Sequence, residues 1–171
     1  MYRMRGKVDV GDEAPGFRAK DVTYHDIDLA GYRGRYNIVL FFYRNSQCQT
    51  CREELTILGR QFDRIVGEDG DTVAISTDGF DVAKNLALDL HLPFHVVSDP
   101  EGDIIREYGV YDKDTDTAYP AVFLIDKNGV VRYRKILRGL DDLAPGEEIV
   151  DRLRGMGTPH GQIPFRSFEP D

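Results

Sequence analysis

Two cysteines and four histidines are the only strong metal or disulfide ligands in this sequence of 171 residues. A single cysteine pair cannot form the scaffold of bridges that supports small disulfide-rich proteins. Long hydrophobic runs are also missing, because the longest, at 38–43, is far too short to cross a bilayer and suits a buried strand. The basic residues at 3–7 are not followed by an apolar secretory core, so we expect a cytoplasmic protein with no membrane partner.

Positive charge is scarce as well. The chain has 22 Lys and Arg against 30 Asp and Glu, which gives a net charge of −8. Proteins that bind nucleic acid or anionic membranes in general need an excess of basic residues, so we expect neither kind of partner and interpret the charge as an aid to solubility. The length predicts one domain at 10–155, between an N-terminal tail at 1–9 and an irregular C-terminal tail at 156–171.

The first half of this domain has the pattern of a parallel strand–helix–strand unit. Residues 37–43 form a continuous β-prone run, as expected of a strand covered on both faces. From Cys51 to Ile65 apolar residues recur at helical spacing, and we place the acidic Glu53 and Glu54 on the opposite, solvent face. Residues 72–76 read as a second buried strand, and such units are right-handed.

The second half adds a hairpin and more helices. The Asn128–Gly129 pair is a strong hairpin signal between two β-prone segments. The predicted elements are a helix at 80–90, a strand at 94–97, a helical turn or two at 104–108, strands at 121–126 and 130–135, and a helix at 147–154. This order predicts an α/β protein with a mixed central sheet and helices on both faces, the layout of a thioredoxin-like fold.

The two cysteines, Cys48 and Cys51, are separated by two residues and stand between the predicted strand and helix. Unpaired backbone N–H groups and the positive end of the helix dipole stabilise a thiolate there and lower its pKa. With Cys48 at the helix start and Cys51 one turn later, we expect the outer sulfur to attack a substrate and the inner one to resolve the mixed disulfide.

Two other interpretations of the pair remain open. The cysteines can be half of a zinc site, which needs two further ligands, and the chain has no second cysteine pair and only four histidines, His25, His91, His95 and His160. They can also be inert, since a free cysteine packs as a small hydrophobic residue. We favour redox chemistry because the strand-to-helix context is typical of redox pairs, and we expect no cofactor and no resident metal.

Pro120 lies just before the predicted strand at 121–126, where a proline without an N–H group is tolerated. If the Tyr119–Pro120 bond is cis, the Tyr119 carbonyl and N–H groups could face the cysteines and hold the extended backbone of a substrate. An ordinary trans proline at a strand start is the alternative.

Between about Val10 and Lys135 the chain resembles the alkyl hydroperoxide reductase/thiol-specific antioxidant (AhpC/TSA) superfamily, which contains peroxiredoxins and related thioredoxin-like reductases. The middle of the chain is most similar to the bacterioferritin-comigratory (Q-type) peroxiredoxins. The resemblance rests on the segments 10–17 (VGDEAPGF), 41–43 (FFY), 98–100 (SDP), 108–110 (YGV) and 123–126 (FLID).

The departures from the peroxiredoxin pattern concern the site itself. Cys51 matches the peroxidatic cysteine, but Cys48 stands at the position of the family's threonine. Arg44 stands where the family has a proline, and Pro120 stands where it has an arginine. The hydroxyl and guanidinium that polarise a peroxide are therefore replaced by the dithiol and proline of thioredoxin-type reductases.

The segment 48–55 (CQTCREEL) is also similar to membrane-tethered thioredoxin-like reductases, which are usually exported. Arg44 and Arg52 flank the pair, and either could place positive charge near the thiolate or simply be solvated. Gln49 and Thr50, the residues between the cysteines, differ from common redox pairs and leave the reduction potential open.

These features predict an oxidoreductase, in first place a thiol–disulfide oxidoreductase that acts on oxidised thiols and is recycled by a thioredoxin or similar dithiol. A thiol peroxidase is the alternative, with Cys51 oxidised by a peroxide and Cys48 resolving. A metal-binding thioredoxin-fold module is a third interpretation, although the copper chaperones of this fold have a histidine where this chain reads Thr117, Ala118, Tyr119. Peroxiredoxin-like domains often dimerise, so a homodimer is one expected assembly.

Overall fold

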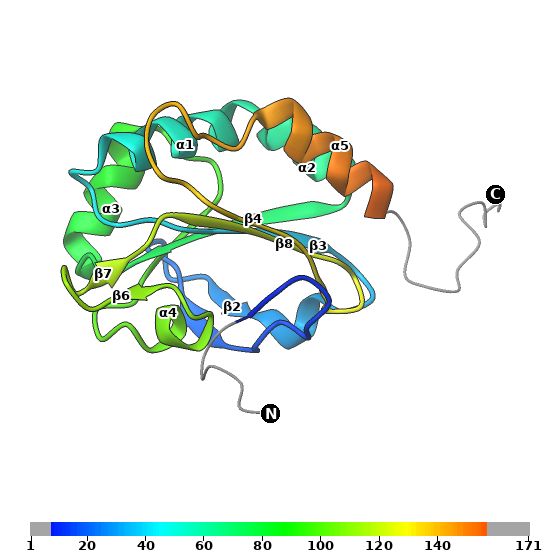
Figure 1. The fold of residues 1–171 in the computed structure, drawn as a ribbon, viewed down its shortest axis with the longest axis horizontal. Coiled ribbons are helices and arrows are strands. Elements are labelled where there is room, and N and C mark those ends of the chain that lie inside the picture. Colours follow the sequence, from blue (N-terminus) through cyan, green and yellow to red (C-terminus); the bar gives the residue numbers. More distant parts are fainter. Residues whose placement is uncertain (1–7, 157–171) are drawn as a thin grey trace, which may run out of the picture.

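The computed structural model describes residues 8–156. Its centre is a five-stranded sheet in the order β5-β4-β3-β8-β9 (Figure 1). Strands β3, β4 and β5 are parallel to one another, and β8 is antiparallel to both of its neighbours, β3 and β9. The strands are β3 (Asn37–Phe42), β4 (Gly70–Ser76), β5 (His95–Ser98), β8 (Ala121–Ile125) and β9 (Val131–Ile136). The predicted mixed sheet and thioredoxin-like layout are confirmed.

Helices cover both faces of this sheet. Four of them, α1 (Gln49–Arg60), α2 (Phe62–Gly67), α3 (Phe80–Asp89) and α5 (Gly146–Met156), pack on one face. The other face carries α4 (Asp103–Glu107), the 3-10 helix η1 (Leu29–Tyr32) and two antiparallel ribbons, β1 (Arg18–Lys20) with β2 (Asp26–Asp28) and β6 (Tyr111–Asp112) with β7 (Thr117–Ala118). No helix within residues 8–156 has the length and apolar content needed to cross a membrane.

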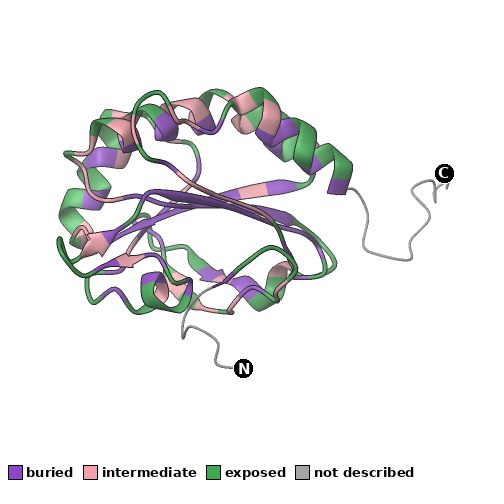
Figure 2. Ribbon diagram, in the orientation of Figure 1, coloured by how far each residue is buried: buried purple, intermediate pink, exposed green. Residues whose placement is uncertain are grey.

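Alternate residues of the central strands supply the two halves of the core. All six residues of β3 are buried, as its continuous apolar run predicts (Figure 2). Phe41 faces the α1 side of the sheet, and Phe42 faces the opposite side, where it packs against Tyr108 and Phe123. Strand β3 is therefore rigidly held where it ends, directly before the cysteines.

The structure differs from the predicted elements in three places. The helix expected from Cys51 to Ile65 bends at Gln61, where α1 ends and α2 begins, and Ile65 then packs on the backbone of Gly70. The β6–β7 ribbon was not predicted, because two-residue strands carry no periodic pattern. Val8 is buried and α5 extends through Met156, so both predicted tails reach slightly into the folded domain, and their remaining residues, 1–7 and 157–171, lie outside the described part.

Candidate redox site

The cysteine pair lies where β3 gives way to α1, as the sequence predicts. The loop between them is shaped by Asn45, whose side-chain Oδ1 accepts the Gln47 N–H at 2.9 Å and whose carbonyl accepts the Cys48 N–H at 3.2 Å. Cys48 is the N-cap of α1, and its sulfur accepts the Cys51 N–H at 3.2 Å. The outer sulfur therefore sits at the helix N-terminus, where an anion is favoured.

Cys48 and Cys51 form a disulfide, with their Cα atoms 5.2 Å apart. The two sulfurs differ in their access to solvent, because Cys51 is 0% exposed and Cys48 is partly exposed. The Cys51 sulfur also accepts the backbone N–H of Arg44 at 3.3 Å. Cys48 is therefore the more accessible of the two sulfurs, and Cys51 is held by the backbone beneath it.

The guanidinium groups of the two flanking arginines, Arg44 and Arg52, contact groups other than the sulfurs. The Arg44 guanidinium donates to Thr115 Oγ1 at 2.9 Å and Thr117 Oγ1 at 3.1 Å and pairs with Asp112, all on the β6–β7 ribbon. Arg52 donates to the Ser46 carbonyl at 2.9 Å and so braces the loop before Cys48. Both arginines thus support the site through its backbone and its neighbouring ribbon.

Other polar groups lie close to the pair. Thr50, between the cysteines, is in the first turn of α1 and partly buried. Asp78, in the loop after β4, accepts the Ser46 N–H, and burial raises the pKa of its carboxyl. Ser98 Oγ donates to the Asp78 carbonyl at 2.6 Å, which ties the end of β5 to the loop after β4.

Tyr119 and Pro120 differ from the substrate-binding arrangement that the sequence suggested. Residues 8–156 contain no cis peptide bond, so the Tyr119–Pro120 bond is trans. The Tyr119 N–H donates to the Val110 carbonyl at 2.7 Å, and the Pro120 carbonyl accepts the Leu137 N–H at 2.8 Å. The trans alternative is therefore the one found, and the Tyr119 N–H is paired within the protein. Substrate binding by Tyr119 and Pro120 stays a prediction. The Tyr119 side chain remains 42% exposed.

Glu54 is the clearest correction within the helix. Its position in the helical pattern predicts a solvent-facing side chain, but Glu54 is fully buried, one turn after Cys51. Its Oε1 accepts the Ala144 N–H at 2.8 Å, whereas Oε2 is buried without a hydrogen bond. Burial raises the pKa of this carboxyl to about 7. The signal was present in the sequence, since Glu54 shares one helical stripe with Cys51 and Leu58, three and four residues away.

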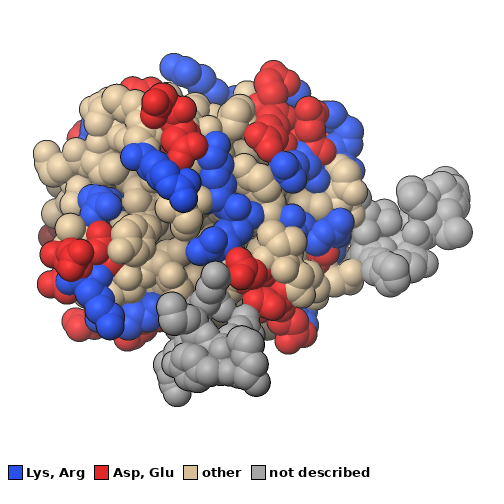
Figure 3. All heavy atoms as spheres, in the orientation of Figure 1, with Lys and Arg blue, Asp and Glu red and all other residues tan. Residues whose placement is uncertain are grey.

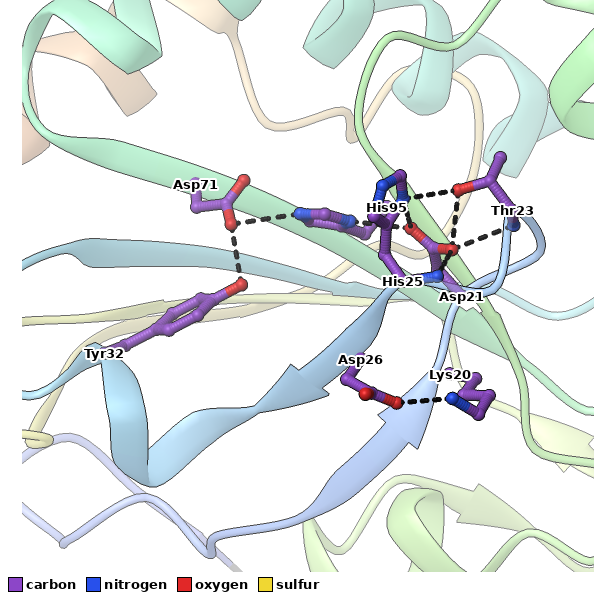
Figure 4. Close-up of polar contacts among 8 residues, drawn as sticks. All are labelled: Lys20, Asp21, Thr23, His25, Asp26, Tyr32, Asp71 and His95. Atoms are coloured by element: carbon purple, nitrogen blue, oxygen red, sulfur yellow. Dashed lines mark hydrogen bonds and ion pairs between the residues drawn. The ribbon is translucent and has the colours of Figure 1, made fainter.

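A second titratable cluster, which the sequence does not predict, lies near the start of β4 and β5 (Figure 4). His95 Nδ1 bonds Asp21 Oδ2 at 2.8 Å and His95 Nε2 pairs with Asp71 Oδ2 at 3.2 Å, while Tyr32 donates to Asp71 at 2.7 Å. Both ring nitrogens face carboxylates, chiefly Asp71, and this raises the pKa of His95 to about 9. The imidazolium is a structural cross-link, because neither nitrogen is left to exchange protons with a substrate.

Within residues 8–156, no three His, Cys, Asp or Glu side chains converge in a way that could hold a metal ion. On the face seen in Figure 3, Lys and Arg side chains are interspersed with Asp and Glu and form no uniformly basic surface.

Comparison with known proteins places this chain in a family. Residues 10–134 match the AhpC/TSA family. Alkyl hydroperoxide reductase E of Mycobacterium tuberculosis is 28% identical over 148 residues, covering 85% of this chain and 93% of the relative. Thiol-disulfide oxidoreductase ResA of Bacillus cereus is 31% identical over 126 residues, covering 73% of this chain and 68% of the relative.

Solved structures of peroxiredoxin-type proteins share this fold. The crystal structure of peroxidoxin BcpB from Mycobacterium tuberculosis superposes with a TM-score of 0.77 at 21% identity and covers 87% of this chain and 98% of its own. A Plasmodium yoelii thioredoxin peroxidase I superposes with a TM-score of 0.70 at 25% identity, covering 86% and 88%. The chain, with its thioredoxin-like fold and its cysteine pair, is therefore an oxidoreductase that belongs to the AhpC/TSA family.

Proposed function

We propose that the protein is a thiol–disulfide oxidoreductase in which Cys48 is the nucleophile and Cys51 the resolving cysteine. The observation that carries the proposal is the asymmetry of the pair. Cys48 is partly exposed at the N-terminus of α1, and Cys51 is buried beneath it and already bonded to it. The partial identity to a relative named as a thiol-disulfide oxidoreductase agrees with this assignment.

The reaction starts from the reduced pair. The Cys48 thiolate attacks one sulfur of a substrate disulfide, and the other substrate sulfur leaves as a thiolate, which takes up a proton. Cys51 then loses its proton and attacks the Cys48 sulfur, so the second substrate thiolate leaves and the protein disulfide forms. The substrate gains two electrons and two protons. A thioredoxin or similar dithiol restores the reduced pair by the reverse exchange.

Trapping of mixed disulfides tests these roles. Cys48→Ser should abolish turnover, because the exposed nucleophile is lost, whereas Cys51→Ser should accumulate a mixed disulfide between Cys48 and the substrate. The measurement is the mass of the adduct after the reduced protein meets an oxidised thiol. Since the chain has two cysteines, Cys48→Ser/Cys51→Ser has no thiol and is the matched control. Equal trapping by the two single variants would contradict the assignment.

A thiol peroxidase is the second candidate, and the observation in its favour is that Cys51 occupies the position of the family's peroxidatic cysteine. In this reaction the Cys51 thiolate attacks the peroxide O–O bond, forms a sulfenic acid and releases an alcohol or water. Cys48 then condenses with the sulfenic acid to give the disulfide and water. Burial of Cys51 and the presence of Pro120 at the arginine position argue against it. Stopped-flow oxidation by hydrogen peroxide no faster than that of a free thiol would exclude this candidate.

Two measurements test the metal-binding interpretation and the expected homodimer. Metal analysis of protein purified without chelator tests the metal-binding interpretation, which requires metal bound in a fixed ratio to protein. Sedimentation of the reduced and oxidised forms tests the expected homodimer.

A further inference from the structure

A small cavity lies next to the start of β3, on the face of the sheet that carries η1. Its volume is about 180 Å³, and its walls come from the chain before β1, from η1, from β3 and from the turn between β8 and β9. The buried side chains of Ala14, Leu29 and Ile38 line it, together with Tyr32. An engineered apolar cavity of roughly 150 Å³ binds benzene, so this one has room for a single ring.

Hydrogen bonds between distant segments hold the walls of this cavity. The Ala14 N–H donates to the Gly129 carbonyl at 2.8 Å, which ties the chain before β1 to the turn between β8 and β9. The Gly34 N–H donates to the Lys127 carbonyl at 2.7 Å, which ties the chain after η1 to the same turn. The cavity is therefore preformed, and a ligand does not have to order its walls.

The rim of the cavity carries a guanidinium that is weakly paired. Arg33 lines the cavity, and its side chain is 49% exposed. It lies against Gly129, where a Cβ would come within 2.7 Å of its Nε atom. Its ion-pair partner, Glu13 Oε2, is 3.7 Å away and itself exposed, and within residues 8–156 the guanidinium makes no hydrogen bond. Exposed pairs of this kind contribute little, so a better acceptor can replace Glu13.

Asp126 is the other charged residue that lines the cavity, but its oxygens are already used. Its Oδ1 accepts the N–H groups of Asn128 and Val130 at 2.9 and 3.0 Å. Its Oδ2 accepts the Arg132 guanidinium at 3.1 Å. Arg33 is therefore the charged group of the cavity that is left to bind a ligand.

We propose that this cavity is a binding site for a small monocarboxylate with a compact apolar body of one ring, whose carboxylate binds Arg33. The apolar walls favour the ring, and a guanidinium matches the two oxygens of a carboxylate. The volume is too small for a nucleotide or a peptide. The cavity lies at the start of β3 and the cysteines follow its end, six residues or roughly 20 Å further on, so the inference does not rest on the proposed redox function.

A titration with phenylacetate, followed by the amide shifts of the isotope-labelled protein, tests the proposal. The shifts should gather at Leu29, Ile38 and Gly129 and should saturate with a Kd on the order of 1 mM, as expected for a ligand of this size. Phenylacetamide has nearly the same shape but no charge. It should bind about tenfold more weakly, because the hydrogen bond from Arg33 loses its charged acceptor.

Three variants locate the ligand. Arg33→Met removes the charge, so phenylacetate and phenylacetamide should bind to it equally weakly. Ala30→Phe fills the cavity from an exposed position on η1 and should abolish the binding of both. Glu13→Gln removes the competing carboxylate and should tighten the binding of phenylacetate alone. Arg35→Met neutralises an exposed arginine that lies over Tyr36, and it is the matched control with wild-type affinity.

The outcomes against the proposal are equally specific. Shifts that stay linear with phenylacetate concentration, or that gather at the cysteine loop, would overturn it. Equal affinity of the wild type for the two ligands would disprove the role of Arg33, and unchanged binding in Ala30→Phe would disprove the location. Cys48→Ser/Cys51→Ser has no thiol and should bind phenylacetate as the wild type does, so the binding site and the proposed redox function fail or hold independently.

Discussion

The buried carboxyl of Glu54 makes the stability of the folded protein depend on pH. Glu54 is 0% exposed, and its pKa is raised by burial from an ordinary value of 4.5 to about 7, against the opposing effects of the Ala144 N–H and Lys135. Between these two pH values the folded protein binds a proton that the unfolded chain releases. The contribution of Glu54 to stability is therefore fully present below pH 4.5 and is lost as the pH rises through about 7.

The size of this loss follows from the pKa difference. A change from 4.5 to about 7 corresponds to about 3 kcal/mol of unfolding free energy. Glu54→Gln removes the titration and keeps an oxygen that can accept the Ala144 N–H. The glutamine amide takes the place of Oε2, which is buried without a partner, so the variant has a cost that does not change with pH.

Urea unfolding of the oxidised wild type and Glu54→Gln, measured from pH 4 to pH 8, tests the prediction. The stability of the wild type relative to the variant should fall by about 3 kcal/mol across this range, and most of the change should lie between pH 4.5 and 7. Glu53→Gln, which neutralises the exposed neighbour on the same helix, is the matched control, with a difference that stays within about 0.5 kcal/mol. A Glu54→Gln difference that is constant with pH, or that rises with it, would refute the burial argument.

Two further predictions concern stability away from the cysteines. His95→Gln should lose most of its disadvantage at alkaline pH, because the pKa of His95 is about 9 against 6.5 in an unfolded chain, so its contribution is fully present below pH 6.5 and lost as the pH rises through about 9. Melting temperatures of wild type and variant should converge between pH 6 and 10, and parallel curves would contradict the imidazolium cross-link. Gly70→Ala should cost about 1–3 kcal/mol, since the new Cβ would lie 2.7 Å from an Ile65 methyl carbon. Gly67→Ala, where a Cβ meets nothing within 4 Å, is its control in thermal unfolding, and equal stability of the two variants would disprove the close contact.

Local patterns were sufficient for the parts of this protein whose structure depends on neighbours in sequence. The apolar run of β3 predicted a strand buried on both faces, and its six residues are buried. The Asn128–Gly129 pair marked the turn between β8 and β9. The spacing of Cys48 and Cys51 after a strand placed both sulfurs at the start of α1, because a helix begins with free N–H groups whatever surrounds it.

The sequence by itself thus determined the fold class, the family and the dithiol, whereas contacts between distant segments decided how the site is supported. The sequence left Arg44 either as a positive charge near the thiolate or as a solvated side chain, but its guanidinium contacts three oxygens on the β6–β7 ribbon. That ribbon could not be predicted, because a strand of two residues has no periodic pattern in the sequence. Glu54 is predicted on the solvent face because charged residues usually lie there, whereas the folded chain buries it and pairs its carboxyl with the Ala144 N–H, 90 residues further along. His95 became a cross-link because the sheet register brings two aspartates to its ring. Register and loop packing are long-range properties, so only the tertiary structure could decide which polar groups meet.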